Sequence, residues 1–160
     1  MLTPREQGDI GELSAMCWLV SKGAHVAVPV GRSPHWDLMA ELDGRPLRVQ
    51  VKTSRCFVRK RWDVTLCTRG GNQSWNGIVK RLDASRYDFL FVLVADGRRW
   101  FIPSDRVEGG SGLRLGGPKY AAFEVERGDP IPQAADVGHA STIDSLDPRG
   151  DVRVAKGVAL

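Results

Sequence analysis

The dipeptide Asp43-Gly44 restricts the fold of this chain more than any other sequence feature. It separates two segments rich in apolar residues. An Asp-Gly pair in this setting is the strongest short signal for a β-hairpin with a two-residue turn, because both turn positions need positive φ. We therefore expect two antiparallel strands, over residues 36–42 and 46–53.

The register of this hairpin predicts a cluster of polar side chains. A two-residue turn pairs Leu42 with Arg45, which sets Asp37 directly opposite Gln50, with Cβ atoms about 5 Å apart. Lys52 lies two residues beyond Gln50 and therefore shares its face. The intervening residues should point to the other, core-facing side: Leu47, Val49 and Val51. A carboxylate, an amide and an ammonium group are thus expected side by side.

The first helix is expected over residues 3–23. Thr3 can cap it, Pro4 suits its first turn, and Glu6 completes a capping box. Four residues recur at helical spacing and are expected to face the core: Ile10, Leu13, Cys17 and Val20. Gly8 and Gly11 inside this helix each cost about 1 kcal/mol relative to Ala. They suggest a close approach by something on that side of the helix, where they would leave room for a phosphate or a metal-bound water.

Periodicity and turn signals predict the other elements. Strands are expected at residues 24–30, 61–67, 89–95, 99–103 and 120–125, and a helix within 77–86. This order indicates an α/β (α+β) domain, over residues 1–128, whose sheet is covered by helices. Residues 129–160 contain few large apolar side chains and should form a flexible tail.

Composition argues against several classes of protein. No apolar run approaches the ~20 residues of a membrane span, and the first residues lack the pattern of a secretion signal. We therefore expect a cytoplasmic protein with no membrane partner. Cys17, Cys56 and Cys67 are odd in number and share no CxxC spacing, so neither a disulfide framework nor a zinc site is expected.

Positive charge is concentrated between Gly44 and Trp62. The net charge is +4, which alone is weak evidence for nucleic-acid binding. This stretch, however, contains seven basic residues and no acidic one: Arg45, Arg48, Lys52, Arg55, Arg59, Lys60 and Arg61. All except Lys52 are candidate DNA contacts, because such a run can neutralise several phosphates. The alternative is a solvated basic face. Phe57, Trp62 and Trp75 are further candidates for contact with DNA, although a buried Trp is the commoner case.

The polar face of the hairpin has the chemistry of a metal site. Mg²⁺ prefers hard oxygen ligands, and Asp37, Gln50 and the backbone carbonyl of Val51 offer them. Glu12 can join if the first helix crosses this face. A bound ion would polarise a phosphate and acidify a water, while Lys52 would position that water or stabilise negative charge. Taken singly, each of these residues also fits a structural role.

The segments around these residues resemble the PD-(D/E)XK nuclease superfamily. Glu12, then Trp36-Asp37-Leu38, then Gln50-Val51-Lys52-Thr53 follow its order of helix Glu, strand Asp and [E/D/Q]xK strand after a hairpin. The Gln-x-Lys form is similar to homing endonucleases encoded in some group I introns. The segment from Arg86 to Pro103 is similar to the later hairpin of that family. Pro34 is a departure, because it lies three residues before Asp37 rather than beside it.

The resemblance implies a restriction-endonuclease-like core, which is a central mixed β-sheet flanked by helices. It implies that Glu12, Asp37 and Gln50 bind Mg²⁺, or another divalent cation such as Mn²⁺, and that Lys52 is the catalytic lysine. It also implies double-stranded DNA as the substrate and a homodimer or homotetramer. Alternatives are a structure-specific nuclease similar to Holliday-junction resolvases, a DNA-binding module without activity, and a structural protein with an accidental pattern.

Overall fold

The computed structural model describes residues 2–31, 35–69, 79–80, 82–108 and 110–133. Residues 2–131 form one compact unit. Ile131 is buried, and its N–H donates to the carbonyl of Ala95 at 3.1 Å. The compact unit thus reaches three residues past the expected boundary at 128, whereas the tail itself stays a prediction. No described helix has the length and hydrophobicity needed to span a membrane.

Helix α1 (Pro4–Ser21) begins and ends as its sequence predicts. The Thr3 hydroxyl accepts from the Glu6 N–H at 3.2 Å, and the Glu6 carboxylate accepts from the Thr3 N–H at 2.7 Å. This is the expected capping box. Gly23, just past the helix, has a φ of 86°, which a glycine adopts without steric cost.

The buried face of α1 differs from the expected one at three of four positions, since Ile10 alone of the four packs against the core. Leu13 and Val20 are 59% and 58% exposed, and Cys17 is exposed as well. The buried positions are instead Gly11, Ala15, Trp18 and Leu19. The reason is a close approach of α1 to the sheet at Gly11. A Cβ there would lie 2.4 Å from Thr53 Cγ2, so only glycine fits, and this contact sets the rotation of the helix.

Gly8→Ala and Gly11→Ala are expected to change stability in opposite directions. A Cβ at Gly8 would meet nothing within 4 Å, so alanine should stabilise by about 1 kcal/mol through helix propensity. At Gly11 the clash costs about 1–3 kcal/mol, and Thr53 cannot turn away without losing the bond from Gln7 Nε2 to its Oγ1, at 2.9 Å. Denaturant unfolding measures both. Equal stabilisation by the two alanines would contradict a tight contact at Gly11.

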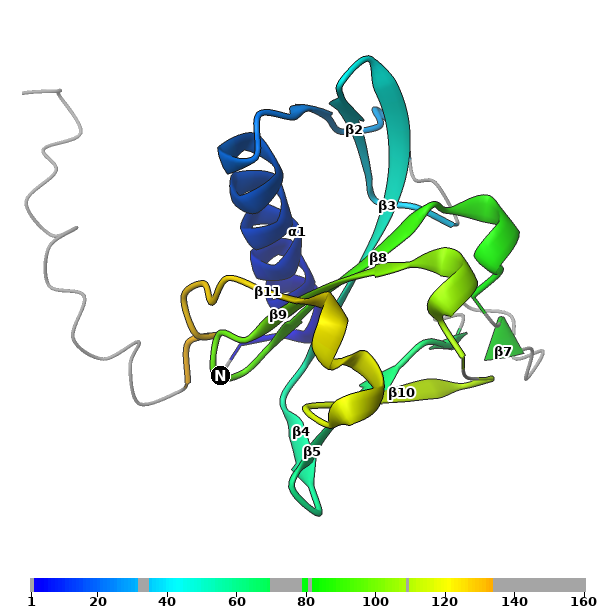
Figure 1. The fold of residues 1–160 in the computed structure, drawn as a ribbon. Helices are drawn as coiled ribbons and strands as arrows, with labels where there is room; N and C mark the ends of the chain where they lie inside the picture. The colour runs from blue at the N-terminus through cyan, green and yellow to red at the C-terminus, as the bar shows by residue number, and fades with distance from the viewer. Residues whose placement is uncertain (1, 32–34, 70–78, 81, 109, 134–160) are drawn as a thin grey trace, which may run out of the picture. The chain divides into compact units, whose positions relative to one another are not determined.

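The main sheet is mixed, as the family resemblance implies (Figure 1). Its strand order is β1-β2-β3-β8-β9-β11, and only the β3–β8 pair is parallel. The strands are β1 (His25–Ala27), β2 (Leu38–Leu42), β3 (Arg45–Ser54), β8 (Phe89–Val94), β9 (Arg99–Pro103) and β11 (Glu124–Val125). The long strand β3 lies inside this sheet, with neighbours on both edges.

The hairpin of β2 and β3 has the predicted turn and register. Asp43 and Gly44 have φ of 52° and 74°, as a two-residue turn of the primed type requires. Leu42 pairs with Arg45, and Leu38 pairs with Val49. Continuing this register by one residue sets Asp37 opposite Gln50, as the sequence predicts.

Both faces of the main sheet are covered. Helix α1 packs on the face that carries Val49, Val51, Phe91 and Leu93. The other face, with Leu90, Val92 and Trp100, packs against a smaller sheet in the order β10-β5-β4. Its strands are β10 (Gly112–Leu115), β5 (Arg61–Thr65) and β4 (Cys56–Val58). Among the described residues this second layer contains no α-helix.

Two further predicted elements differ from the structure. Where a helix was expected within residues 77–86, the described part has strand β7 (Val79–Lys80), paired with β6 (Thr68–Arg69), and a short 3-10 helix η1 (Ala84–Arg86). Residues 120–125 are mostly the 3-10 helix η3 (Pro118–Phe123). Only Glu124 and Val125 of this segment form the expected strand, as β11 paired with β9, while the buried Tyr120 hydroxyl bonds to the backbone of Glu108.

Candidate functional site

Asp37 lies immediately before β2, and its side chain extends the β2–β3 ladder. Its N–H donates to the Val49 carbonyl at 2.9 Å. Its Oδ2 accepts from the Val51 N–H at 2.7 Å and also from Gln50 Nε2. The carboxylate therefore takes the place of a backbone acceptor, which holds it against β3 at the point where β2 begins.

Gln50 is buried, at 6% exposure, in the middle of β3. Besides its bond to Asp37, its Nε2 donates to the backbone carbonyl of Val51 at 3.2 Å. One nitrogen thus reaches two acceptor oxygens. These oxygens must converge on a single position beside the strand.

Lys52 is half-buried, two residues beyond Gln50. Burial lowers the pKa of its ammonium group, while the charges of Asp37 and Cys67 oppose that shift. For Asp37, burial raises the pKa, opposed by the Val51 N–H, the Lys52 charge and Gln50. The two charged groups are close enough to influence each other, so the structure brings together three of the predicted residues.

Glu12 approaches Asp37, Gln50 and Lys52 from the opposite face of β3, and not from the expected one. Helix α1 covers the opposite face of β3, because Gly11 lies against Val51 and Thr53. The pKa of Glu12 is nevertheless raised, first by burial and then by the negative charges of Asp37 and Asp9. The negative charge of Asp37 therefore acts on the Glu12 carboxylate. Gly11 provides close packing rather than space for a phosphate.

The oxygens at this site fit a divalent cation such as Mg²⁺. Within the described part of the chain, no three His, Cys, Asp or Glu side chains gather as a metal cluster. A cation would depend on two carboxylates, from Asp37 and Glu12, and two neutral oxygens, from Gln50 and Val51. These are the hard ligands that Mg²⁺ prefers, and two of them already converge.

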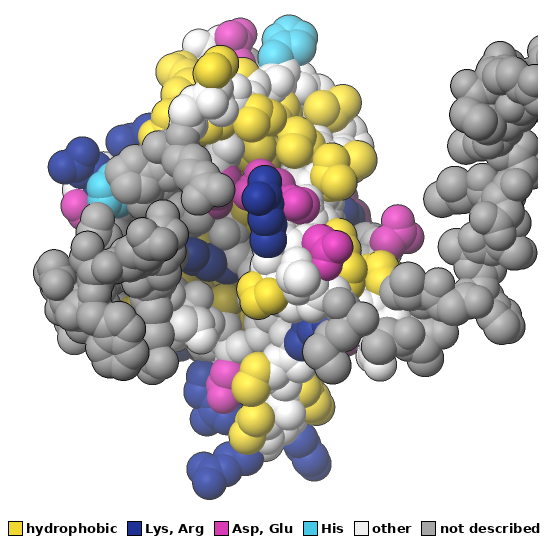
Figure 2. Space-filling model, turned by 180° about the vertical axis from the view of Figure 1, so that it is seen from behind, with side chains coloured by type: hydrophobic (Ala, Val, Ile, Leu, Met, Phe, Trp, Pro, Cys, Tyr) yellow, Lys and Arg dark blue, Asp and Glu magenta, His cyan; other side chains and the backbone are white. Residues whose placement is uncertain are grey.

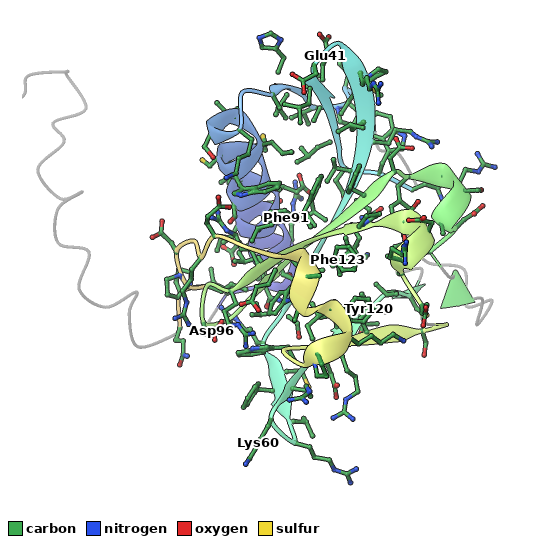
Figure 3. The ribbon with its side chains drawn as sticks, in the orientation of Figure 1. Glu41, Lys60, Phe91, Asp96, Tyr120 and Phe123 are labelled. Atoms are coloured by element: carbon green, nitrogen blue, oxygen red, sulfur yellow. The ribbon has the colours of Figure 1, made fainter. Side chains whose placement is uncertain are left out.

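A hairpin that sequence analysis missed carries part of the basic run. Strands β4 and β5 are joined by Arg59 and Lys60, which have φ of 50° and 61°. This is a primed turn without the usual Asn or Gly, so no turn signal announced it. Figure 3 places Lys60 at its tip, and Figure 2 shows Lys and Arg side chains at the projecting lower end of the molecule. Phe57 beside the turn is 55% exposed.

The other basic residues are spread along β3. Arg45 begins the strand and Arg55 follows its end, which separates them by about 30 Å at ~3.3 Å per residue. Arg48 is held in an ion pair by Asp88, at 2.9 Å. The basic run is thus one segment in sequence but not one patch in space. Trp62 is buried at 7% exposure, and Trp75 lies outside the described residues.

Comparisons with known proteins give a family and a fold for this chain. Residues 2–115 match the family described as PD-(D/E)XK endonuclease. The solved structure of a bacterial homing endonuclease, I-Ssp6803I, is similar with a TM-score of 0.59 and 23% sequence identity, and the match covers 78% of this chain and 88% of that chain. A search of curated proteins found no match. The family match spans Glu12, Asp37, Gln50 and Lys52.

Proposed function

Because the chain belongs to the PD-(D/E)XK endonuclease family, we propose that it hydrolyses phosphodiester bonds in double-stranded DNA with a divalent cation, Mg²⁺ or Mn²⁺. The catalytic residues are Glu12, Asp37, Gln50 and Lys52. One observation carries the proposal: the oxygens of Asp37 and Val51 converge on one point beside the half-buried Lys52.

Three of these residues have roles that their surroundings support. Asp37, anchored by the Val51 N–H, and Glu12 hold the cation from the protein side. When bound, the ion supplies Lewis acidity and a water of lowered pKa. The Lys52 ammonium group positions that water or stabilises the charge that develops on the phosphate, and its partial burial strengthens this interaction.

The β4–β5 hairpin is the proposed principal DNA contact. A two-stranded ribbon fits the major groove of B-DNA. Arg59, Lys60 and the neighbouring Arg61 offer positive charge for phosphates, and none of them has an ion-pair partner among the described residues. Left-handed backbone at two residues other than glycine costs of order 1 kcal/mol each. An Asn-Gly turn would avoid this cost, but it would lack the positive charges of Arg59 and Lys60.

Arg59→Asn with Lys60→Gly is expected to weaken DNA binding without weakening the fold. Asn-Gly is the preferred pair for this turn, so the free energy of unfolding should stay equal or rise. If both side chains contact phosphates, the slope of log affinity against log salt should flatten by about 2. Fluorescence anisotropy at several salt concentrations measures the slope, with Ca²⁺ in place of Mg²⁺.

The matched control removes two charges elsewhere. Lys119 and Arg127 are surface cations paired with Glu108 and Asp96, at 2.8 and 3.1 Å, and their replacement by Asn should leave the salt slope unchanged. If the hairpin variant binds DNA like the wild type, the basic turn is a solvated surface and not a DNA contact.

The homing type of activity is the first candidate, since the fold is similar to that of a homing endonuclease. The test is incubation of the purified protein with plasmid and genomic DNA, with Mg²⁺ or with EDTA. Discrete fragments that need Mg²⁺ support this candidate. Cutting of four-way junctions but not of linear duplex would favour a structure-specific nuclease instead. Salt-sensitive binding to all of these substrates without any cleavage would favour a DNA-binding module.

Cleavage of both DNA strands favours an assembly with more than one site. We therefore propose a homodimer or a homotetramer. Light scattering coupled to gel filtration measures the mass directly, and a monomer that makes double-strand breaks would overturn this part of the proposal.

A further inference from the structure

The side chain of Gln50 presents its nitrogen, and not its oxygen, to the candidate metal site. Nε2 donates to Asp37 Oδ2 and to the Val51 carbonyl, the latter at 3.2 Å. An ionised carboxylate and a carbonyl can only accept hydrogen bonds. With the amide reversed, its oxygen would face two acceptors and both bonds would be lost, so the surroundings determine the orientation.

The amide nitrogen therefore bonds to two of the oxygens that would hold a cation. Asp37 and the Val51 carbonyl are two of the proposed metal ligands, and an NH₂ group bonded to both is at their point of convergence. We propose that Gln50 is a placeholder for the cation: its amide holds both oxygens in binding geometry in the metal-free protein, and the entering ion displaces the NH₂ group so that the amide oxygen turns toward it. This inference rests on the metal site of the proposed function.

A placeholder solves a physical problem of an empty site. A half-buried carboxylate and a buried carbonyl without donors would destabilise the fold. The Val51 N–H supplies Asp37 Oδ2 with one donor, and Gln50 supplies the second donor for Asp37 as well as one for the Val51 carbonyl. An ionised Glu at position 50 could donate to neither and would add a second negative charge beside Asp37. Glutamine is therefore expected to stabilise the empty site and to reduce its affinity for metal.

Nuclear magnetic resonance of the full chain tests the displacement directly. The side-chain NH₂ signals of Gln50 are identified by their loss in Gln50→Glu. Adding Mg²⁺ without DNA should move these signals together with the backbone signals of Asp37 and Val51. The side chain of Gln7 is an internal control, because its Nε2 donates to Thr53 Oγ1 at 2.9 Å and is not displaced. Backbone signals that move while the Gln50 NH₂ signals stay in place would overturn the inference.

Two variants that add the same charge test the energetic consequence. Gln50→Glu removes the placeholder, whereas Gln7→Glu adds a carboxylate on the neighbouring helix without touching the convergent oxygens. We expect Gln50→Glu, and not Gln7→Glu, to lower the Tm in EDTA and to lower the Kd for Mg²⁺ by about tenfold, since ligand charge sets the affinity of such sites. The same Tm and Kd in both variants would contradict a special role of Gln50.

The outcomes separate this inference from the proposed function. Cleavage that needs Mg²⁺, together with unmoved Gln50 signals, keeps the nuclease and overturns the placeholder. Binding of Mg²⁺ by Gln50→Glu but not by the wild type overturns both the displacement of the amide and Mg²⁺-dependent cleavage by the wild type. Binding by neither protein overturns the metal site, and the placeholder with it.

Discussion

Asp37→Asn is expected to reduce Mg²⁺-dependent DNA cleavage about a thousandfold. Asparagine keeps the size of the side chain, and its oxygen can still accept from the Val51 N–H, so the fold should persist. The lost charge interaction with a cation is worth roughly 4 kcal/mol at about 4 Å in a partly buried site, which corresponds to that factor in rate. Single-turnover cleavage of labelled duplex measures the rate, and thermal unfolding with and without Mg²⁺ measures the loss of metal binding.

Glu41→Gln is the matched control for this change. Glu41 lies on β2, the strand that Asp37 precedes, but it is exposed near the hairpin turn. The Glu41→Gln variant should cleave DNA at the rate of the wild type and keep the Mg²⁺-dependent rise in Tm. If Asp37→Asn cleaves within tenfold of the wild type, the catalytic site lies elsewhere.

Lys52→Met is expected to reduce cleavage by about 100- to 1,000-fold while leaving Mg²⁺ binding intact. Lys52 is not a ligand in the proposed site, so its loss removes charge stabilisation but no metal contact. Methionine has a similar length and tolerates the half-buried position. The Mg²⁺-dependent rise in Tm should therefore remain, in contrast to Asp37→Asn. Loss of that rise in Lys52→Met would mean that Lys52 supports the metal site itself.

The pH dependence of cleavage gives a second readout of Lys52. Burial lowers the pKa of its ammonium group, so the rate should fall with rising pH at values below the ordinary 10.5, as the positive charge is lost. Burial raises the pKa values of Asp37 and Glu12, so the acidic loss should begin above their ordinary range, as protonation removes the metal ligands. The residual activity of Lys52→Met should keep the acidic limb and lose this alkaline limb.

Local chemistry accounts for the parts of the site that the sequence predicts. The Asp43-Gly44 turn sets the register of β2 and β3, because both of its residues adopt the positive φ that a two-residue turn requires. This register alone places Asp37 beside Gln50. The capping box of Thr3 and Glu6 likewise depends on neighbouring residues only. Features of this kind are independent of distant packing, which explains why the structure reproduces them.

Other features depended on packing between distant segments. The periodicity of Leu13 and Val20 indicated a core face, yet the close contact of Gly11 with Thr53 turned α1 so that both side chains are exposed. A hairpin with Arg59 and Lys60 in its turn carries no local signal. Neither feature could be derived without knowing which surfaces meet.

The sequence by itself determined the central hairpin, its register and the set of polar residues opposite one another, because a turn and its two strands are local. Only the tertiary structure decided that Gln50 is buried with its NH₂ group against Asp37, that Glu12 approaches from the other face of β3, and that Arg45 and Arg59 belong to different regions. These outcomes result from the packing of a helix and a second sheet on the two faces of β3, and such long-range contacts leave no periodic signal in the chain.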